Sequence, residues 1–208
     1  MRWSFVIMLA GCQGGVFGGV AVGNPTMNGS LARTEGVALE LAKTHAVGSF
    51  VPCRGGSTTE VDLGEINLVQ GFRFSGPAEL TCELHVSFLS ALQVSGSGAG
   101  GSLEATLTPV GVAFVLEPVD AVGRASMYDL ELGATDWLGP LADDLAVGDV
   151  RLNPSSPEYD ALVNSLVTGS GLYVDDGDGV LSDAQRAAGP IVSGAPSTLV
   201  VGTDDTGP

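Results

Sequence analysis

Apolar and polar residues alternate with a period of two along several stretches of this chain, which predicts strands with one buried and one solvent-facing side. The clearest stretch covers residues 79–94. Its apolar positions, predicted to face inward, are Leu80, Cys82, Leu84, Val86 and Phe88, whereas Thr81, Glu83, His85 and Ser87 are predicted to face outward. Shorter alternating rows lie at residues 37–42, 60–68, 72–74, 103–107, 110–116 and 128–132.

The alternation changes phase within residues 60–68. Val61 and Leu63 lie on one side, but the next apolar pair, Ile66 and Leu68, is offset by one residue. Such a shift turns the following side chains to the other face unless a bulge absorbs it. We therefore expect a β-bulge at residues 64–65.

Signals for helices occur only in the C-terminal third of the chain. Apolar residues at helical spacing around Pro140 predict a short helical turn, and a cap cluster at residues 155–158 precedes a second helical pattern that stops at Gly169. Ser182 and Gln185 match a capping box, which predicts a helix ending near Ala188. We expect a helix-loop-helix over residues 156–188.

These elements predict a mainly β fold. Seven or eight short strands separated by turn residues favour an antiparallel β-sandwich or open barrel with one or two short C-terminal helices. A parallel α/β sheet is disfavoured because no helical pattern separates the strands.

The length and composition favour one domain. The chain has 208 residues, 44% of them apolar, which is enough for a single core. We expect the β-rich domain to span residues 35–200. Residues 12–34 are rich in glycine and lack either period, so they predict a tether, and residues 201–208 lack an apolar anchor and predict a disordered tail.

The charge balance argues against a nucleic-acid partner. Eight Lys and Arg side chains stand against 24 Asp and Glu, which gives a formal net charge of −16. Affinity for a phosphate backbone comes from clustered Lys and Arg, and this chain has a single lysine, Lys43.

The first residues combine a positive charge, Arg2, with a mostly apolar run over residues 3–11, which is too short to span a bilayer as a helix. The segment Leu9-Ala10-Gly11-Cys12 resembles the lipobox of bacterial lipoprotein precursors, in which the cysteine is acylated and becomes the first mature residue. The resemblance implies a signal peptide over residues 1–11 and a lipid anchor on Cys12. Gln13 after the cysteine implies the outer membrane of the cell envelope. The alternative is an ordinary buried strand over residues 3–10.

Two cysteines remain when Cys12 is set aside. Cys53 and Cys82 form an even pair, which favours a disulfide in an oxidising compartment. The alternative is two buried thiols that pack as small apolar groups. A zinc site is disfavoured because the chain has no C-x-x-C pair and only two histidines.

Residues 173–185 form an acidic, glycine-rich stretch that resembles the calcium loops of EF-hand proteins and, less closely, the Asp-Gly repeats of thrombospondin type 3 and dockerin modules. Calcium takes six to eight oxygen ligands from a sharply turning loop. With Gly179 at the turn position, the resemblance implies a calcium site with ligands from Asp175, Asp176, Asp178, the Val180 carbonyl, Ser182, Asp183 and Gln185.

Two positions depart from the EF-hand pattern. Asp175 comes one residue after the first ligand position, and Gln185 replaces the closing glutamate. A deformed loop that uses Asp175 or Asp183 is expected to bind calcium weakly, with a dissociation constant of about 10⁻⁴ to 10⁻³ M. The alternative is a solvated turn ahead of a capped helix.

Catalytic motifs are missing from the sequence. It contains no G-x-S-x-G elbow, P-loop or dinucleotide fingerprint. The two histidines, His45 and His85, occupy ordinary strand positions, and the strand acids are predicted to lie on solvent faces, at Glu60, Asp62, Glu83 and Glu104. We assign no catalytic residue.

The sequence therefore favours a non-catalytic lipoprotein of the bacterial cell envelope, with a structural, adhesive or ligand-presenting role toward an unidentified protein or glycan. Two alternatives stay open. One is a surface-anchored or secreted hydrolase with a carboxylate-based site, and the other is a periplasmic module that binds a small ligand.

Overall fold

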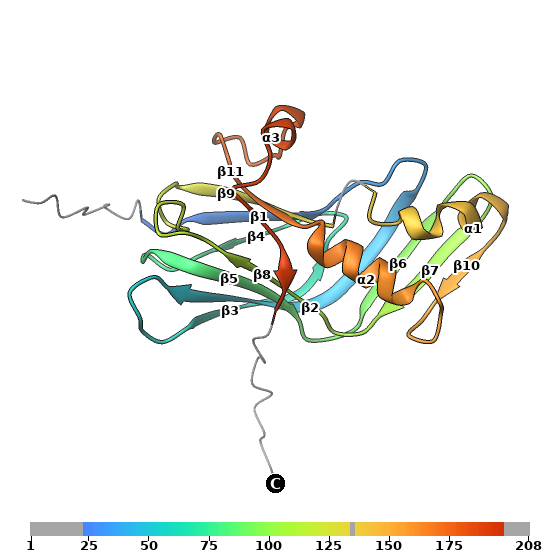
Figure 1. Ribbon diagram of the computed structural model, residues 1–208, viewed down its shortest axis with the longest axis horizontal. Helices are drawn as coiled ribbons and strands as arrows, with labels where there is room; N and C mark the ends of the chain where they lie inside the picture. Colours follow the sequence, from blue (N-terminus) through green and yellow to red (C-terminus); the bar gives the residue numbers. More distant parts are fainter. Residues whose placement is uncertain (1–22, 134–135, 198–208) are drawn as a thin grey trace, which may run out of the picture.

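The alternating segments form two β-sheets in a computed structural model that describes residues 23–133 and 136–197 (Figure 1). One sheet has eight strands and the other has five. The sheets stack face to face, and three short helices lie beside or above them (Figure 1). The prediction of a mainly β sandwich with a few short helices is confirmed.

The larger sheet is organised around one long strand, β2, which spans Ala38–Pro52. Its path runs β10-β7-β6-β2-β5-β8-β13, and β3 pairs with β2 as a branch. The other strands of this sheet are β3 (Thr59–Asn67), β5 (Thr81–Phe88), β6 (Leu92–Ser97), β7 (Ser102–Leu107), β8 (Gly111–Val115), β10 (Val150–Leu152) and β13 (Ala195–Pro196).

The predicted strand over residues 79–94 is divided into β5 and β6, which pair one after the other along the same edge of β2. Ser90 lies in the break between them. Its hydroxyl accepts a hydrogen bond from the His45 N–H at 2.9 Å, and its carbonyl accepts one from the Thr44 hydroxyl at 3.0 Å. These bonds satisfy the backbone N–H of His45 and the carbonyl of Ser90, where the regular ladder of hydrogen bonds between the strands stops.

The smaller sheet has the order β12-β11-β9-β1-β4. Its strands are β1 (Thr26–Leu31), β4 (Phe72–Ser75), β9 (Met127–Leu132), β11 (Gly171–Val174) and β12 (Val192–Ser193). β1 pairs parallel with β9 and antiparallel with β4. β10 also pairs parallel with β7, so the expectation of a purely antiparallel sandwich is corrected at two strand pairs.

The expected tether over residues 12–34 is wrong in its second half. Residues 26–31 form β1, which lies between β9 and β4 and buries Met27 and Leu31. The segment reads as a linker because Asn28, Gly29 and Ser30 are poor strand formers, and neighbouring strands on both sides override that local preference.

The helices follow the predicted order. The turn around Pro140 becomes a 3-10 helix, η1 (Gly139–Leu141), and α1 (Ala142–Val147). α2 (Tyr159–Thr168) begins directly after the predicted cap cluster at residues 155–158 and has no side-chain cap. α3 (Asp183–Ala188) has both hydrogen bonds of the predicted capping box. The expected helix-loop-helix is corrected, because β11 lies between α2 and α3.

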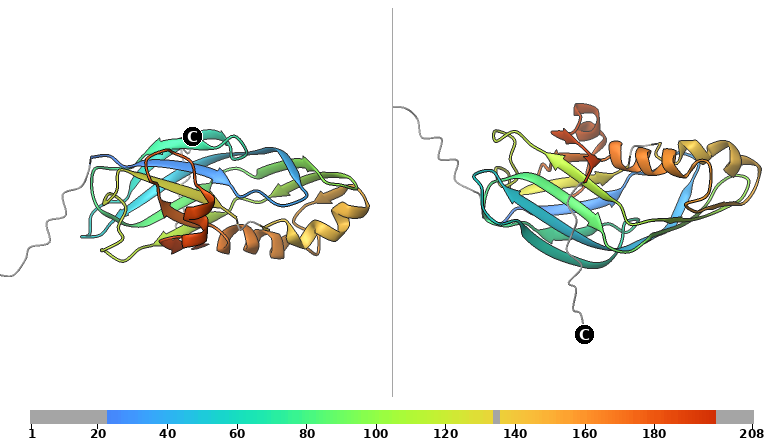
Figure 2. Two further views of the ribbon diagram at one scale, coloured as in Figure 1. Left: turned by 90° about the horizontal axis from the view of Figure 1, so that it is seen from above. Right: turned by 60° about the horizontal axis from the view of Figure 1, so that its bottom comes forward.

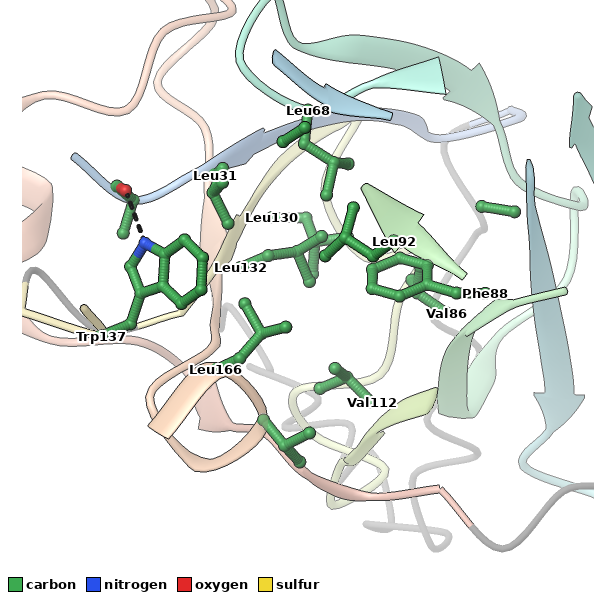
Figure 3. Close-up of a cluster of buried hydrophobic side chains, with 14 of the residues drawn as sticks. Leu31, Leu68, Val86, Phe88, Leu92, Val112, Leu130, Leu132, Trp137 and Leu166 are labelled. Atoms are coloured by element: carbon green, nitrogen blue, oxygen red, sulfur yellow. Dashed lines mark hydrogen bonds between the residues drawn. The ribbon is translucent and has the colours of Figure 1, made fainter. Parts of the chain in front are cut away.

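The core lies between the two sheets and is closed along one side by α1 and α2 (Figure 2). Leu130 and Leu132 of β9 face Val86 and Phe88 of β5 across this space, and Leu166 of α2 fills its side (Figure 3).

Among the described residues, Trp137 is the largest fully buried side chain. Its indole N–H donates to the Ala32 carbonyl at 3.3 Å, the dashed line of Figure 3, so the polar atom of this ring is satisfied inside the core.

Two finer predictions have different outcomes. The register of β2 and β3 shifts between Asp62 and Gly64, where Gly64 has a φ of +66°. This confirms a bulge and places it one residue before the predicted 64–65. His85 was predicted to face outward, but it is buried, and its Nδ1 lies 2.8 Å from the hydroxyl of Ser197, which follows β13.

Candidate cation site

A row of polar side chains lies on the outer face of the five-stranded sheet. Asn28 of β1, Asp129 of β9 and Tyr173 of β11 are directly opposite one another in the sheet register, so their side chains share a face. Glu131 follows Asp129 by two residues on that face. The chain after β11 and helix α3 covers this row, as Figure 1 shows above β9 and β11.

The loop that follows β11 is held to the sheet by Asp175, which is buried. The Asp175 N–H donates to the Met127 carbonyl at 3.2 Å, and one carboxylate oxygen accepts from the N–H groups of Gly177 and Gly179. Both glycines have positive φ values, +108° and +75°, which allow the loop to wrap around the carboxylate.

The loop gathers three of the predicted metal ligands. Carboxylate oxygens of Asp175, Asp176 and Asp178 lie within 4.8 Å of one another. Asp176 and Asp178 are exposed, and Asp178 Oδ1 accepts a hydrogen bond from the Val180 N–H at 2.9 Å. A hard cation coordinated by oxygen at about 2.4 Å fits between oxygens at this spacing.

Three of the remaining predicted ligands, Ser182, Asp183 and Gln185, have other partners. Ser182 Oγ accepts from the Gln185 N–H at 3.2 Å, and Gln185 Oε1 accepts from the Ser182 N–H at 2.7 Å. The other end of the Gln185 amide donates to the Val174 carbonyl at 3.1 Å. Asp183 is fully exposed and pairs with Arg186 at 3.2 Å. The oxygens of Ser182 and Gln185 therefore stabilise the start of α3.

A further carboxylate, Asp129, lies beneath the loop against Asp175. Only 3% of Asp129 is exposed. The Asn28 amide bridges the two acids, because its Nδ2 lies 3.3 Å from Asp129 Oδ1 and 3.1 Å from Asp175 Oδ2. Asp129 Oδ2 is buried and has no hydrogen-bond partner among the described residues.

The two acids differ in their pKa. Burial, and then the negative charge of Asp175, raise the pKa of Asp129 from its ordinary value of 3.8 to about 6. Burial also acts to raise the pKa of Asp175, but the N–H groups of Gly177 and Gly179 outweigh it and lower that pKa. Asp175 is therefore the more strongly held anion of the pair.

Helix α3 is fixed to the same sheet face by an ion pair. Arg186 reaches Glu131 at 2.9 Å, and the Glu131 side chain is 8% exposed. This contact holds α3 against β9, two residues along the strand from Asp129.

Asn28 and Asp129 were not predicted as site residues from the sequence. The only signal for Asp129 was its place, with Glu131, at the polar positions of an otherwise apolar strand. Such positions are normally solvated, and their burial here depends on a loop that is distant in sequence.

Other groups that attract attention in the sequence have structural partners. His85 lies 3.4 Å from Glu83 as well as close to Ser197, and it is buried in the sheet. A shallow groove on β6 and β7 is lined in part by Glu104, which is paired with Arg151 at 3.2 Å. Neither place brings two free acids together.

Two covalent sites were expected, a disulfide and a lipid anchor, and only the first lies within the described residues. Cys53 and Cys82 form a disulfide with a Cα–Cα distance of 4.7 Å, which joins the segment after β2 to β5. Cys12 and the rest of the lipobox-like segment lie outside the described residues. Within residues 23–133 and 136–197, no helix has the length and hydropathy needed to cross a membrane.

Comparisons with known proteins found no matching family model, no matching curated protein and no matching solved structure.

Proposed function

We propose that this chain is a lipid-anchored protein of the bacterial cell envelope, a non-catalytic β-sandwich with a structural calcium loop. Its role would be structural, adhesive or ligand-presenting at the outer membrane.

The observation that carries this proposal is the Cys53–Cys82 disulfide. Disulfides persist in oxidising compartments outside the cytosol, which is where a protein acylated at Cys12 would reside. The bond closes a loop of 29 residues, and loops of this size gain about 3 kcal/mol of stability from the cross-link.

The anchor is tested by expressing the full chain in a Gram-negative host with labelled palmitate. The wild type and Gln13→Ala, which keeps the cysteine, should carry label and partition into detergent. Cys12→Ser should lose both properties, because a single cysteine provides the attachment point for the acyl chains. An unlabelled wild type, or a Cys12→Ser variant that stays with membranes, would contradict the anchor.

The calcium loop is supported by the gathering of Asp175, Asp176 and Asp178. A cation bound only by the folded protein raises its stability by mass action. At about 5 mM calcium and the weak affinity expected for this loop, the gain is about 1 to 2 kcal/mol.

The corresponding measurement is a thermal melt of the purified protein with calcium, with magnesium and with chelator. Calcium should raise the Tm of the wild type, and Asp178→Asn should remove most of that rise. An identical Tm in calcium and chelator would mean that the loop is only a turn.

A further inference from the structure

The acidic loop lacks a closing ligand of its own. In the EF-hand pattern the last ligand is a glutamate that supplies two oxygens, and here that position is Gln185, whose side chain is bonded to Ser182 and Val174. Two exposed acids and one buried acid remain in the loop. A cation held there needs further oxygens from outside the loop.

The sheet below the loop presents such an oxygen. Only 3% of Asp129 is exposed, and its Oδ2 has no hydrogen-bond partner among the described residues. Its carboxylate lies against that of Asp175, since a single amide nitrogen of Asn28 contacts both. An ionised, buried carboxylate oxygen without a donor is costly. This cost is removed when Asp129 takes up a proton that it shares with Asp175, or when the oxygen binds a cation.

Within residues 23–133 and 136–197, no positive side chain forms an ion pair with Asp129 or Asp175. Arg186 of α3 is paired with Glu131 and Asp183 instead. The local excess of negative charge on this face therefore includes Asp129, Asp175, Asp176 and Asp178.

We propose that Asp129 of β9 is a ligand of the cation held by the acidic loop, so that the ion joins the loop to the five-stranded sheet through Asp129 and Asp175. This inference rests on the calcium site proposed above and identifies the ligand that replaces the missing glutamate.

Asn28 fits the same role. The two ends of an amide are exchanged by a rotation of the side chain, which turns its oxygen toward the place where the nitrogen now contacts both carboxylates. With a cation between the acids, that oxygen is a further neutral ligand. The preferred ion is calcium, because it accepts a large and irregular set of oxygens, whereas magnesium requires near-ideal octahedral geometry.

The decisive experiment is a calorimetric calcium titration of the full chain and two variants at neutral pH. Asp129→Asn keeps the shape of the buried side chain and removes its charge. Asp160→Asn removes an exposed acid on α2 and serves as the matched control. We expect Asp129→Asn to weaken calcium binding by about tenfold or more, because affinity follows the number of charged ligands, and Asp160→Asn to bind as the wild type does.

The outcomes separate this inference from the proposed function. If the wild type binds calcium and Asp129→Asn binds equally well, the loop holds the ion alone and Asp129 is not a ligand. If the wild type shows no binding at about 10 mM calcium, the calcium loop itself is refuted, and this inference falls with it.

A second measurement avoids any dependence on the variant. Calcium added to wild-type protein labelled with ¹³C should shift the side-chain carboxyl resonance of Asp129 together with those of Asp175 and Asp178. A shift confined to the loop carboxyls would overturn the assignment of Asp129.

Discussion

Gly29 shows how a single residue position constrains the five-stranded sheet. It lies in β1 between Leu130 of β9 and Phe72 of β4. A Cβ atom at Gly29 would lie 2.1 Å from the Phe72 ring, so the absence of a side chain lets the ring lie across the strand. Phe72 in turn stacks on Phe74 at a centroid distance of 5.9 Å.

We therefore expect Gly29→Ala to lower the free energy of unfolding by about 1 to 3 kcal/mol, because the ring must move. Gly148→Ala is the control, since a Cβ there meets nothing within 4 Å and the backbone is extended with a φ of 176°. Urea unfolding of both variants checks this. Equal midpoints for the two variants would show that the Phe72 ring adapts without cost.

Asp129 makes a prediction about pH at the same scale. Its pKa is raised to about 6 in the folded protein, so the folded state holds this proton more tightly than the unfolded state does. The stabilising contribution is complete below about pH 4 and is lost as the pH rises through about 6. The pKa of Asp175 is lowered from its ordinary value of 3.8, so the titration of Asp175 changes the stability only at a pH below this window.

Asp129→Asn should remove this loss of stability at neutral pH. In chelator at about pH 7 we expect the variant to be more stable than the wild type by about 1 to 3 kcal/mol, and the difference to shrink toward about pH 4. Urea unfolding across this range measures it. A variant that is less stable than the wild type at neutral pH would show that Asp129 is not a strained anion.

At the scale of elements, α3 has six residues and no buried side chain, so its position depends on few contacts. The ion pair between Arg186 and Glu131 is the main one, because Glu131 is nearly buried. Removing the partner of a buried charge costs more than the pair itself contributes.

Arg186→Gln should lower the free energy of unfolding by about 1 to 3 kcal/mol. Arg151→Gln breaks an exposed ion pair, whose side chains are 81% and 64% exposed. This variant should change the free energy of unfolding by no more than about 0.5 kcal/mol. Denaturant unfolding, with hydrogen exchange of residues 183–188, compares the two. The prediction fails if the variants are equally stable and α3 stays protected in both.

The elements also differ in how far they could be predicted. α3 was predicted with its capping box because Ser182 and Gln185 are three residues apart and the motif is local. The sequence of β1 predicts a linker, because its burial comes from β9, about 100 residues away in the chain. The division of residues 79–94 into β5 and β6 likewise depends on contacts with β2, at Thr44 and His45.

The whole molecule carries a net charge of −16 with only eight basic residues. Most of the ion pairs among the described residues are exposed, such as Lys43 with Glu65. Repulsion among the acids should therefore exceed the attraction within these pairs, and the compact state should suffer more from it than the unfolded chain.

We expect the Tm in chelator to rise when sodium chloride is increased from about 0.01 M to about 1 M, because the Debye length then falls from about 30 Å to about 3 Å. Arg186→Gln should show the same trend, since its ion pair is one among many charges. A Tm that falls with salt would mean that attractive pairs dominate.

Local patterns were enough to specify the class of this fold. Period-two alternation, turn residues and the late capping motif depend on neighbours a few positions apart, and they predicted the strands, the bulge at Gly64 and helix α3. The pair of cysteines that remains when Cys12 is set aside likewise predicted the bond between Cys53 and Cys82.

The pairing of strands and the candidate cation site required the folded molecule. Asn28, Asp129 and Asp175 are separated by 101 and 46 residues along the chain, and no local pattern relates them. They meet because β9 pairs with β1 on one side and with β11 on the other, and this order of strands is a property of the folded sheet. The same covering by the loop and α3 buries Asp129, and burial by distant segments cannot be read from alternation alone.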